Sequence, residues 1–254
     1  MTGTGAERPC PETGGTTDMT TDPTNQDRQL VWDGCLNVRE LGGLPTLDGR
    51  RTRRGAVVRA DNLDRLTAEG WTALQQYGIR TVVDLRDAAD HRPLLPRPEG
   101  IELVRVPLDE LAGSAWWERF GELDGTPLSF LPYLEHCPQA VTAVVAAVAD
   151  AGPGGVVVHC GAGRDRTGLA ALVLLAAAGV TPAAIVSDYL LSAPNLRPLW
   201  AMLARPDQQL AIDAVLGRAG TTAEAALSDA LRAFSPDAYL PAEGLAGVRG
   251  RLLG

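Results

Sequence analysis

The chain has 254 residues, 45% of them hydrophobic, and a formal net charge of −8 at pH 7. This length and hydrophobic content suffice for one sizeable core, and no apolar run approaches the roughly 20 residues that span a bilayer. The excess of negative charge disfavours non-specific binding to nucleic acid. The composition therefore indicates a globular chain with no stable membrane insertion and no nucleic-acid partner.

The first 27 residues differ in composition from the rest. Residues 1–27 are polar and rich in Thr, Gly and Pro, so they are predicted to be a disordered tail, and residues 28–254 are expected to form one domain. The tail lacks the basic and apolar segments of a secretory signal, so the expected compartment is the cytoplasm. The cysteines form no CxxC pair, so neither a disulfide framework nor a zinc site is expected; they are Cys10, Cys35, Cys137 and Cys160.

Taken in chain order, residues 37–63 are expected to form a glycine-punctuated loop with a turn at Asp48-Gly49 and a short strand near 56–59. A helix follows, capped by Thr67, ended by Gly78 and carrying three apolar side chains on one face, namely Trp71, Leu74 and Tyr77. Buried strands are then predicted at 79–87 and 101–108.

The apolar spacing in the second half of the chain predicts mainly helices. Residues 109–127 have no clear period and are expected to be a loop or a short helix, and 130–148 are predicted to be helical with an interruption at Pro138. A strand at 155–159 and a helix from about 166 to 178 follow. Thr181-Pro182 then starts a helical region that runs to residue 254, with a capping box from Thr221 to Glu224.

Strands that alternate with helices indicate an α/β fold with a mostly parallel central sheet flanked by helices. In such sheets, ligands bind at the carboxyl ends of the strands. Two chemically interesting segments lie at such ends, namely VVVHCGAGRDRTG (156–168) and the Asp84-Leu85-Arg86 unit. The site is therefore expected at this edge of the sheet.

The segment 156–168 places a thiol and two guanidiniums where a strand passes into a helix. A helix N-terminus offers free N–H groups and the positive end of the helix dipole, which attract an anion. Gly161 and Gly163 let several N–H groups converge, and Arg166 can hold two phosphate oxygens. The same field stabilises Cys160 as a thiolate, which can attack phosphorus and form a cysteinyl-phosphate that water then hydrolyses.

Several side chains could assist this chemistry. Thr167 is expected to donate its hydroxyl to the sulfur, and His159 to orient the loop and tune the sulfur. The leaving oxygen needs a proton from an aspartic acid, either Asp165 within the loop or Asp84 at the neighbouring strand end. The two arginines beside Asp165 are expected to lower its pKa, which favours Asp84. Against this, a carboxylate in an Asp-Leu-Arg unit commonly braces loops.

Each feature alone has a simpler explanation. A cysteine that ends a buried strand is commonly an inert core thiol, and a lone histidine is commonly structural. The glycines do not complete a dinucleotide-binding G-x-G-x-x-G, because Arg166 stands at the last glycine position, and no G-K-[ST] of a nucleotide P-loop is present. The spacing of Cys, five residues and Arg, with His before and Thr after, is far more specific than any one of these elements.

The segment HCGAGRDRTG (159–168) matches the HCxxGxxR signature of the cysteine-dependent protein tyrosine phosphatases, and it resembles most the bacterial group with the loop HCxxGKDRTG. Other segments resemble that group too, namely NVRELGG (37–43), RRGAVVRADNL (53–63), IRTVVDLRDAAD (79–90), SDYLLS (187–192), and the stretch around Tyr239-Leu240 and Gly244-Leu245. The resemblance covers about residues 30–254. It implies the tyrosine-phosphatase fold and phosphomonoester hydrolysis with no metal or other cofactor.

Applied to individual residues, the resemblance implies that Cys160 is the nucleophile and that Arg166 binds the phosphate oxygens. It places Asp165 ahead of Asp84 as the general acid. The residues expected to bind substrate are Gly161, Ala162, Gly163, Arg164 and Arg59. A catalytically inactive phosphate-binding module is disfavoured, because the expected nucleophile, phosphate-binding arginine and general acid are all present.

Three departures from the group's pattern affect what it predicts. Glu40 stands in place of Asp and Asp90 in place of Glu, which keeps the charge and changes the reach. Arg164 replaces Lys, which exchanges a flexible point charge for a planar guanidinium. This departure leaves two substrate classes open. The first is a phosphotyrosine protein, and the alternative is a dual-specificity or phosphoinositide substrate. Some members carry helices that cover the site, so residues 193–234 are expected either to form such a lid or to complete the core.

Overall fold

The computed structural model describes residues 27–254, so the predicted tail lies outside the described residues except for its last member. Within the described part, one five-stranded sheet has the order β1-β2-β5-β3-β4. β1 is antiparallel to β2, and the other neighbouring pairs are parallel, so the predicted mostly parallel α/β sheet is confirmed. The strands are β1 (Arg39–Glu40), β2 (Val57–Ala60), β3 (Ile79–Asp84), β4 (Glu102–Arg105) and β5 (Gly155–His159).

The three inner strands are rich in β-branched residues, which suit a sheet that is buried on both faces. β5 lies at the centre, where Val157 pairs with Val58 of β2 and with Val82 of β3. All five residues of β5 are buried. β4, at the edge, is only partly buried.

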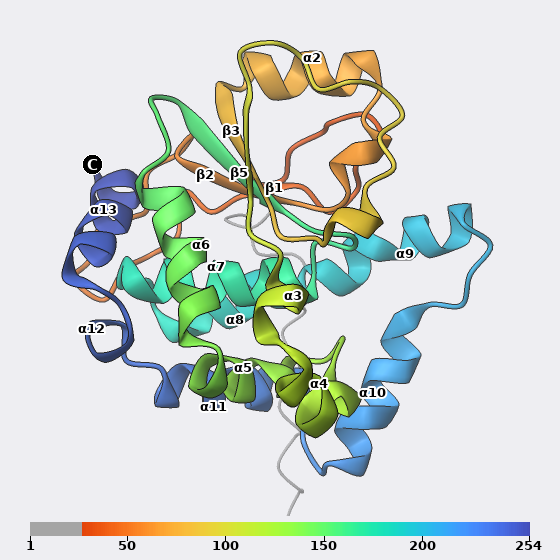
Figure 1. Cartoon of the computed structure of the whole chain (residues 1–254), viewed down its shortest axis with the longest axis vertical. Helices are drawn as coiled ribbons and strands as arrows, with labels where there is room; N and C mark the ends of the chain where they lie inside the picture. Colours follow the sequence, from red (N-terminus) through yellow and green to blue (C-terminus); the bar gives the residue numbers. More distant parts are fainter. Residues whose placement is uncertain (1–26) are drawn as a thin grey trace, which may run out of the picture.

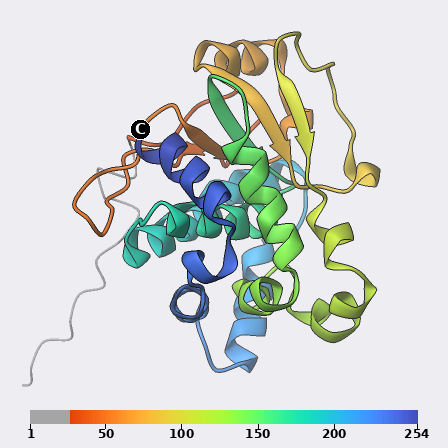
Figure 2. The same ribbon diagram turned by 60° about the vertical axis from the view of Figure 1, so that its left-hand side comes forward.

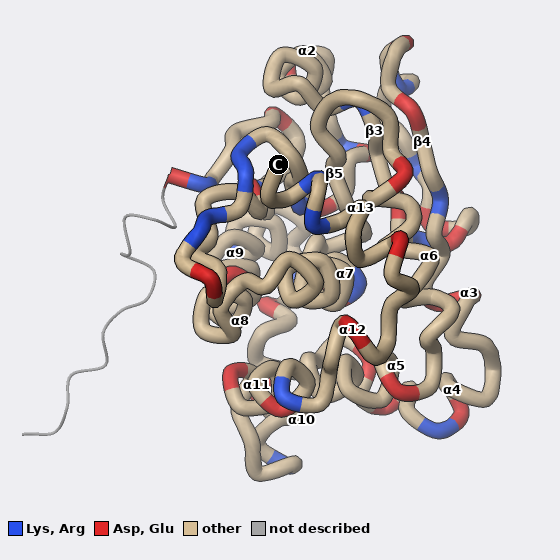
Figure 3. The backbone as a smooth tube through the Cα atoms, turned by 90° about the vertical axis from the view of Figure 1, so that its left-hand side faces the viewer, with Lys and Arg blue, Asp and Glu red and all other residues tan. Residues whose placement is uncertain are grey.

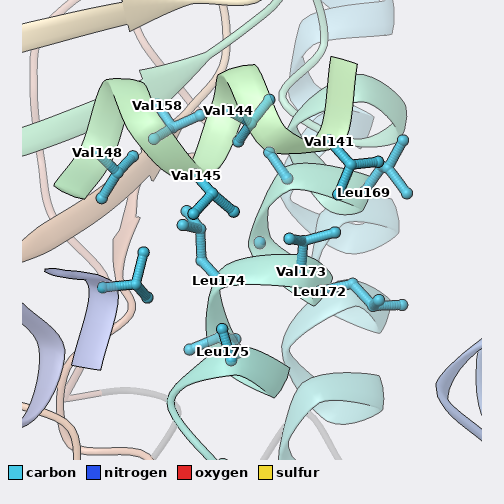
Figure 4. Close-up of a cluster of buried hydrophobic side chains, with 14 of the residues drawn as sticks. Val141, Val144, Val145, Val148, Val158, Leu169, Leu172, Val173, Leu174 and Leu175 are labelled. Atoms are coloured by element: carbon cyan, nitrogen blue, oxygen red, sulfur yellow. The ribbon is translucent and has the colours of Figure 1, made fainter. Parts of the chain in front are cut away.

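Helices cover both faces of the sheet (Figure 1). The helix α2 (Ala68–Gln76) covers one face and begins at Thr67, whose hydroxyl accepts a hydrogen bond from the Gly70 N–H. The other face carries α6 (Pro138–Ala149) and α7 (Asp165–Ala177). On α6, apolar residues recur at the helical spacing and face the leucines of α7 and Val158 of β5 (Figure 4). The α6 residues concerned are Val141, Val144, Val145 and Val148.

The last helix of the chain, α13 (Ala242–Leu253), lies beside α6 (Figure 2). The two helices approach closely, because a Cβ atom at Gly247 would lie 2.6 Å from the Cβ atom of Ala149. The predicted interruption at Pro138 is also present. α5 (Phe130–His136) ends before it, and the proline occupies the first turn of α6, where its missing N–H breaks no helical hydrogen bond.

The predicted helical run after residue 182 is confirmed as a series of separate helices: α8 (Pro182–Leu190), α9 (Ser192–Met202), α10 (Gln208–Arg218), α11 (Ala223–Ala233), α12 (Pro236–Tyr239) and α13. α11 belongs to the main core, since Leu227 and Ala230 are buried there. α10 projects from the body of the molecule (Figure 1) and buries only Ile212 and Leu216. Within the range 193–234, α11 is therefore packed into the main core, whereas α10 contacts the rest of the molecule through few buried side chains.

Short elements fill the segments that follow β3 and β4. The 3-10 helices η2 (Leu63–Arg65) and η3 (Ala88–Asp90) lie before and after the α2–β3 unit. The region predicted as a loop or a short helix contains several short helices instead. They are α3 (Leu108–Ala112), α4 (Ser114–Phe120), η4 (Gly121–Leu123) and η5 (Pro127–Ser129).

Some predicted boundaries were wrong. The strand predicted at 79–87 ends at Asp84, whose carboxylate accepts a hydrogen bond from the Arg86 N–H and turns the chain. The strand predicted at 101–108 covers only β4, because Pro107 and the start of α3 interrupt it. The cap of α11 is Thr222 rather than Thr221, since its hydroxyl accepts from the Ala225 N–H.

The parallel strands bring distant residues to one edge of the sheet. Asp84, the last residue of β3, pairs in register with His159, the last residue of β5. The loop after β5 and the segments after β3 and β4 therefore meet at the carboxyl edge, as expected for a ligand site. Among residues 27–254, no helix is both long and apolar enough to cross a bilayer.

Candidate active site

The loop between β5 and α7 is the centre of the site. Cys160 follows the last residue of β5 and is buried, with only 3% of its surface exposed. It contributes to the same apolar cluster as Val158, so its side chain points to the face of the sheet that α6 and α7 cover. Gly163 has a φ of +67°, and a Cβ atom there would lie 2.5 Å from the Ala60 carbonyl oxygen. Only glycine therefore fits this position.

Two polar side chains hold the loop from behind. The Asn37 side-chain amide donates to the carbonyl oxygens of Ala162 and Gly163, each at 3.1 Å. Arg59 donates to the same Gly163 oxygen at 2.7 Å. In a trans peptide the N–H points away from the C=O, so the N–H groups of Gly163 and Arg164 are directed to the opposite side. The loop can thereby present N–H donors to an anion.

Arg59 was predicted to bind substrate, and the structure places it elsewhere. Its side chain is 1% exposed and forms an ion pair with Asp188 at 2.6 Å. Asp188 also accepts from Arg28 at 2.8 Å and from Arg39 at 3.0 Å. Although burial opposes it, the three guanidiniums hold the pKa of Asp188 well below its usual range. Arg59 therefore supports the loop from within the core instead of reaching the ligand.

Arg166 lies at the mouth of the loop. Its Nη2 atom is 3.8 Å from the point where a Cβ atom on Gly161 would lie. Its Nη1 atom is 2.8 Å from Oδ2 of Asp109 and 3.4 Å from Oδ2 of Asp90. One edge of the guanidinium thus faces the loop while the other is held by carboxylates, which fixes its orientation.

Sequence reasoning missed Asp109 and gave Asp90 no role at Arg166. Asp109 lies on α3, four positions after the last residue of β4, at the same edge of the sheet as Cys160. Burial, which outweighs the opposing charge of Arg166, raises the pKa of Asp109 to about 6, and neighbouring carboxylates add to the rise. The sequence signal that could have identified it is an aspartate just past a predicted strand end.

Asp165 and Arg164 form a pair beside the loop. The Nε atom of Arg164 lies 3.1 Å from Oδ1 of Asp165, and its Nη2 atom lies 3.4 Å from Oε1 of Gln208 on α10. Burial raises the pKa of Asp165 above its ordinary value even though Arg164 opposes the rise. Arg164 and Arg166 lower this pKa, as expected, but burial outweighs them, so the predicted net direction was wrong. Arg164, expected at the pocket rim, is largely buried.

Asp84 and His159 lie on the other side of the sheet from the Cys160 thiol. The Asp84 carboxylate accepts from Arg86 at 2.9 and 2.7 Å and lies 3.3 Å from Nε2 of His159. Although burial opposes it, these partners hold the pKa of Asp84 well below its usual range. Nδ1 of His159 lies 3.4 Å from the Cys160 carbonyl oxygen, so the two side chains brace the backbone at Cys160.

The hydrogen bond expected from Thr167 to the sulfur is not formed. The Thr167 hydroxyl is buried and finds no hydrogen-bond partner among residues 27–254. A buried hydroxyl without a partner is energetically costly. The side chain lies in the first turn of α7, and nothing in the described structure explains its orientation.

The predicted lid range lies partly over the loop. Ala162 packs against a small apolar cluster on α9, formed by Leu196, Leu199 and Trp200. Asn195 also contacts Asn37 behind the loop, at 3.3 Å. α9 and the start of α10 therefore cover the loop, whereas α11 belongs to the core. Whether α9 and α10 move as a lid stays a prediction.

A small pocket of about 20 Å³ opens beside Arg166, with room for about one water molecule. Its walls combine carboxylates with aromatic rings, namely Asp109, Asp124, Asp165, Trp116, Trp117, Phe130 and Tyr133. In residues 27–254, no group of three or more His, Cys, Asp or Glu side chains is arranged to hold a metal ion.

Three curated proteins are similar to this chain in sequence. A relative from Cupriavidus necator, named as an inferred tyrosine-protein phosphatase, is 32% identical over 175 residues, which cover 63% of this chain and 62% of that protein. A tyrosine-protein phosphatase from Nostoc commune is 34% identical over 148 residues, or 56% of this chain and 49% of that protein. The alignments thus span less than two thirds of either relative.

A third relative is matched over more of its length. The triple specificity protein phosphatase PtpB of Mycobacterium tuberculosis is 27% identical over 228 residues, covering 77% of this chain and 80% of that protein. The model of the tyrosine phosphatase family matches residues 30–248, which include the loop from Cys160 to Arg166 and the aspartates beside it. The chain therefore belongs to the tyrosine phosphatase family.

Proposed function

We propose that this chain is a protein-tyrosine-phosphatase that hydrolyses phosphomonoesters through a cysteinyl-phosphate, with phosphorylated proteins of the cytoplasm as substrates. The observation that carries the proposal is the loop from Cys160 to Arg166. It begins with a buried thiol, directs N–H groups away from Asn37 and Arg59, and ends with a guanidinium held over Gly161. A phosphate bound there would be held by the N–H groups and by Arg166.

The reaction then has two steps. In the first, the Cys160 thiolate attacks phosphorus, the S–P bond forms, and the P–O bond to the leaving group breaks while an acid protonates the leaving oxygen. In the second, water attacks phosphorus, the S–P bond breaks, and the same carboxylate accepts a proton from the water. Arg166 and the loop N–H groups stabilise the charge on the transferred oxygens in both steps.

We assign the proton donor to Asp165 instead of Asp84. Asp165 lines the same small pocket as Arg166, and burial raises its pKa, which favours the protonated form that a donor needs. Asp84 is held ionised by Arg86 and His159, and it lies across the sheet from the thiol. Asp84 and His159 are accordingly proposed to fix the backbone of Cys160.

A dual-specificity or phosphoinositide phosphatase would use the same residues. This alternative is supported by the relative named a triple specificity phosphatase. An idle phosphate-binding module has less support, because Cys160, Asp165 and Arg166 are all present in one loop.

The proposal is tested with purified protein and an aryl phosphate such as para-nitrophenyl phosphate. Cys160→Ser should abolish turnover, because a serine hydroxyl is not ionised at neutral pH. The matched control is Cys35→Ser, since Cys35 is also buried but contacts the Asn62 carbonyl instead of the loop. Full activity of Cys160→Ser, or equal loss in both variants, would overturn the assignment.

A further inference from the structure

Four aspartates from three separate segments surround the outer side of Arg166. Asp87 and Asp90 come from the region of η3, Asp109 from α3, and Asp124 from the junction of η4 and η5. Asp90 and Asp109 pair with Arg166 directly. Asp124 lines the same small pocket as Asp109, Asp165 and Arg166, and Asp87 accepts a hydrogen bond from the Glu110 N–H beside Asp109.

These carboxylates act on one another and on the site. Burial raises the pKa of Asp109 to about 6 against the charge of Arg166, with further contributions from Asp87, Asp124 and Asp90. Asp124 adds to the rise in the pKa of Asp165, after burial. The negative field of the mouth therefore reaches the residue that we assign as proton donor.

The cations of the loop do not offset this charge. Arg164 is paired with Asp165, Arg166 with Asp109 and Asp90, and Arg59 with Asp188. The chain contains no lysine. Within residues 27–254, Asp87 and Asp124 form no ion pair of 4.0 Å or less. Asp87 and Asp124 therefore add negative charge beside Arg166 that no ion pair of the described residues neutralises.

A concentration of arginines lies in another part of the molecule. The segment 50–54 carries four of them and docks on α13, where the Arg53 N–H donates to the Leu252 carbonyl oxygen. Figure 3 shows these basic positions near the chain end, on a different side of the molecule from α3 and α4. They are not placed to receive extra phosphates of a ligand bound at Cys160.

We infer that the aspartates around Arg166 select phosphotyrosine segments with arginine or lysine beside the phosphotyrosine and reject ligands that carry several phosphates. The inference rests on the proposed function and defines its substrate class. The loop and Arg166 accept one phosphate, and a second anionic group next to it would meet like charges at the mouth. A cationic side chain at the same place would be attracted by Asp87 and Asp124.

The test compares three phosphotyrosine peptides of equal length with two arginines, two glutamines or two glutamates beside the phosphotyrosine. At low ionic strength, kcat/KM should be about tenfold higher for the arginine peptide than for the glutamate peptide, with most of the difference in KM. The ratio should fall as salt rises towards about 0.15 M, because exposed charges are screened. The soluble head group of a phosphatidylinositol bisphosphate should be cleaved more slowly than the glutamine peptide.

Two variants test whether Asp87 and Asp124 cause the preference for the arginine peptide. The double variant Asp87→Asn, Asp124→Asn should shrink the arginine-to-glutamate ratio about threefold, because it removes two charges from the mouth. Asp150→Asn is the matched control, since Asp150 is exposed and follows α6 at the opposite edge of the sheet. It should leave the ratio unchanged. The salt dependence of the unaltered enzyme tests the same inference without any substitution.

The outcomes separate this inference from the proposed function. Turnover of para-nitrophenyl phosphate reports the chemistry alone, so its absence would contradict the proposed function. Turnover together with equal rates for the three peptides would overturn the charge selection, and so would a preference for the glutamate peptide or the phosphoinositide head group. An unchanged ratio in the double variant would overturn the assignment to Asp87 and Asp124.

Discussion

The Nη1 atom of Arg166 lies 2.8 Å from the Oδ2 atom of Asp109, and this ion pair joins the end of the loop after β5 to the segment that follows β4. The contact holds one edge of the guanidinium, so the other edge remains directed at the loop near Gly161. An arginine that is oriented before the ligand arrives loses less conformational entropy on binding. The position of α3 therefore fixes the orientation of Arg166 although no part of α3 belongs to the loop.

Replacing Asp109 by Asn should lower kcat/KM about tenfold to a hundredfold, because a misplaced clamp loses contact with the transition state. The loss should be similar for aryl and alkyl phosphates. Asp90→Asn should cost less, since its contact with Arg166 is longer, at 3.4 Å, and more exposed. Steady-state kinetics decide this prediction. A loss that grows with the basicity of the leaving group would instead make Asp109 the proton donor.

The proton donor can be identified by leaving-group dependence. Asp165→Asn should slow alkyl phosphates, whose leaving groups are basic, much more than an aryl phosphate with an acidic phenol, and it should remove the alkaline limb of the pH–rate profile. Asp84→Asn should slow all substrates alike, because Asp84 braces His159 and Arg86. The reverse pattern would exchange the two roles.

The attachment of α9 and α10 can be measured by amide hydrogen exchange. α10 buries only two side chains, and α9 contacts the loop through the cluster at Ala162. Segments with few buried contacts open at low free energy. Exchange in both helices should be faster than in the sheet and should slow when vanadate is bound. Strong protection in the free enzyme would show that these helices complete the core and are not a lid.

The Asp84 carboxylate should make stability depend on pH. Its pKa in the folded protein lies below the unfolded value of about 3.9, so its contribution is present above about pH 4 and is lost as the pH falls further. Asp84→Asn should lower the free energy of unfolding at pH 7 by about 2 kcal/mol, because Arg86 loses the charge of one of its two carboxylate partners and keeps Asp64. The difference from the unaltered protein should shrink in acid. Urea titrations at several pH values measure this difference in the free energy of unfolding, with Asp150→Asn as control. A difference that stays constant as the pH falls would contradict the lowered pKa of Asp84.

Much of the fold was predictable because its signals are local. The valine runs of β3 and β5 mark buried strands, and Thr67 and Pro138 mark helix starts where the structure has them. Cys160 and Arg166 could be singled out together because seven consecutive residues carry the whole pattern. Their grouping in one loop needs no knowledge of the rest of the chain.

What sequence reasoning missed depends on contacts between distant residues. The pair of Arg166 and Asp109 joins positions 57 residues apart. The burial of Arg59 depends on Asp188, 129 residues away. The pKa of Asp165 was given the wrong direction because neighbouring charges are visible in a sequence, whereas burial is not. These three features arise only when the strands and helices have packed.

The central claim is that Cys160 forms a covalent bond to phosphorus. The most direct measurement mixes the enzyme with an aryl phosphate, quenches the reaction within the first turnovers and maps the phosphorylated residue by mass spectrometry. The account predicts a phosphocysteine at Cys160, which should accumulate further in a variant whose second step is slowed. Turnover with phosphate on another residue, or with no phosphoenzyme even when the second step is slowed, would contradict it.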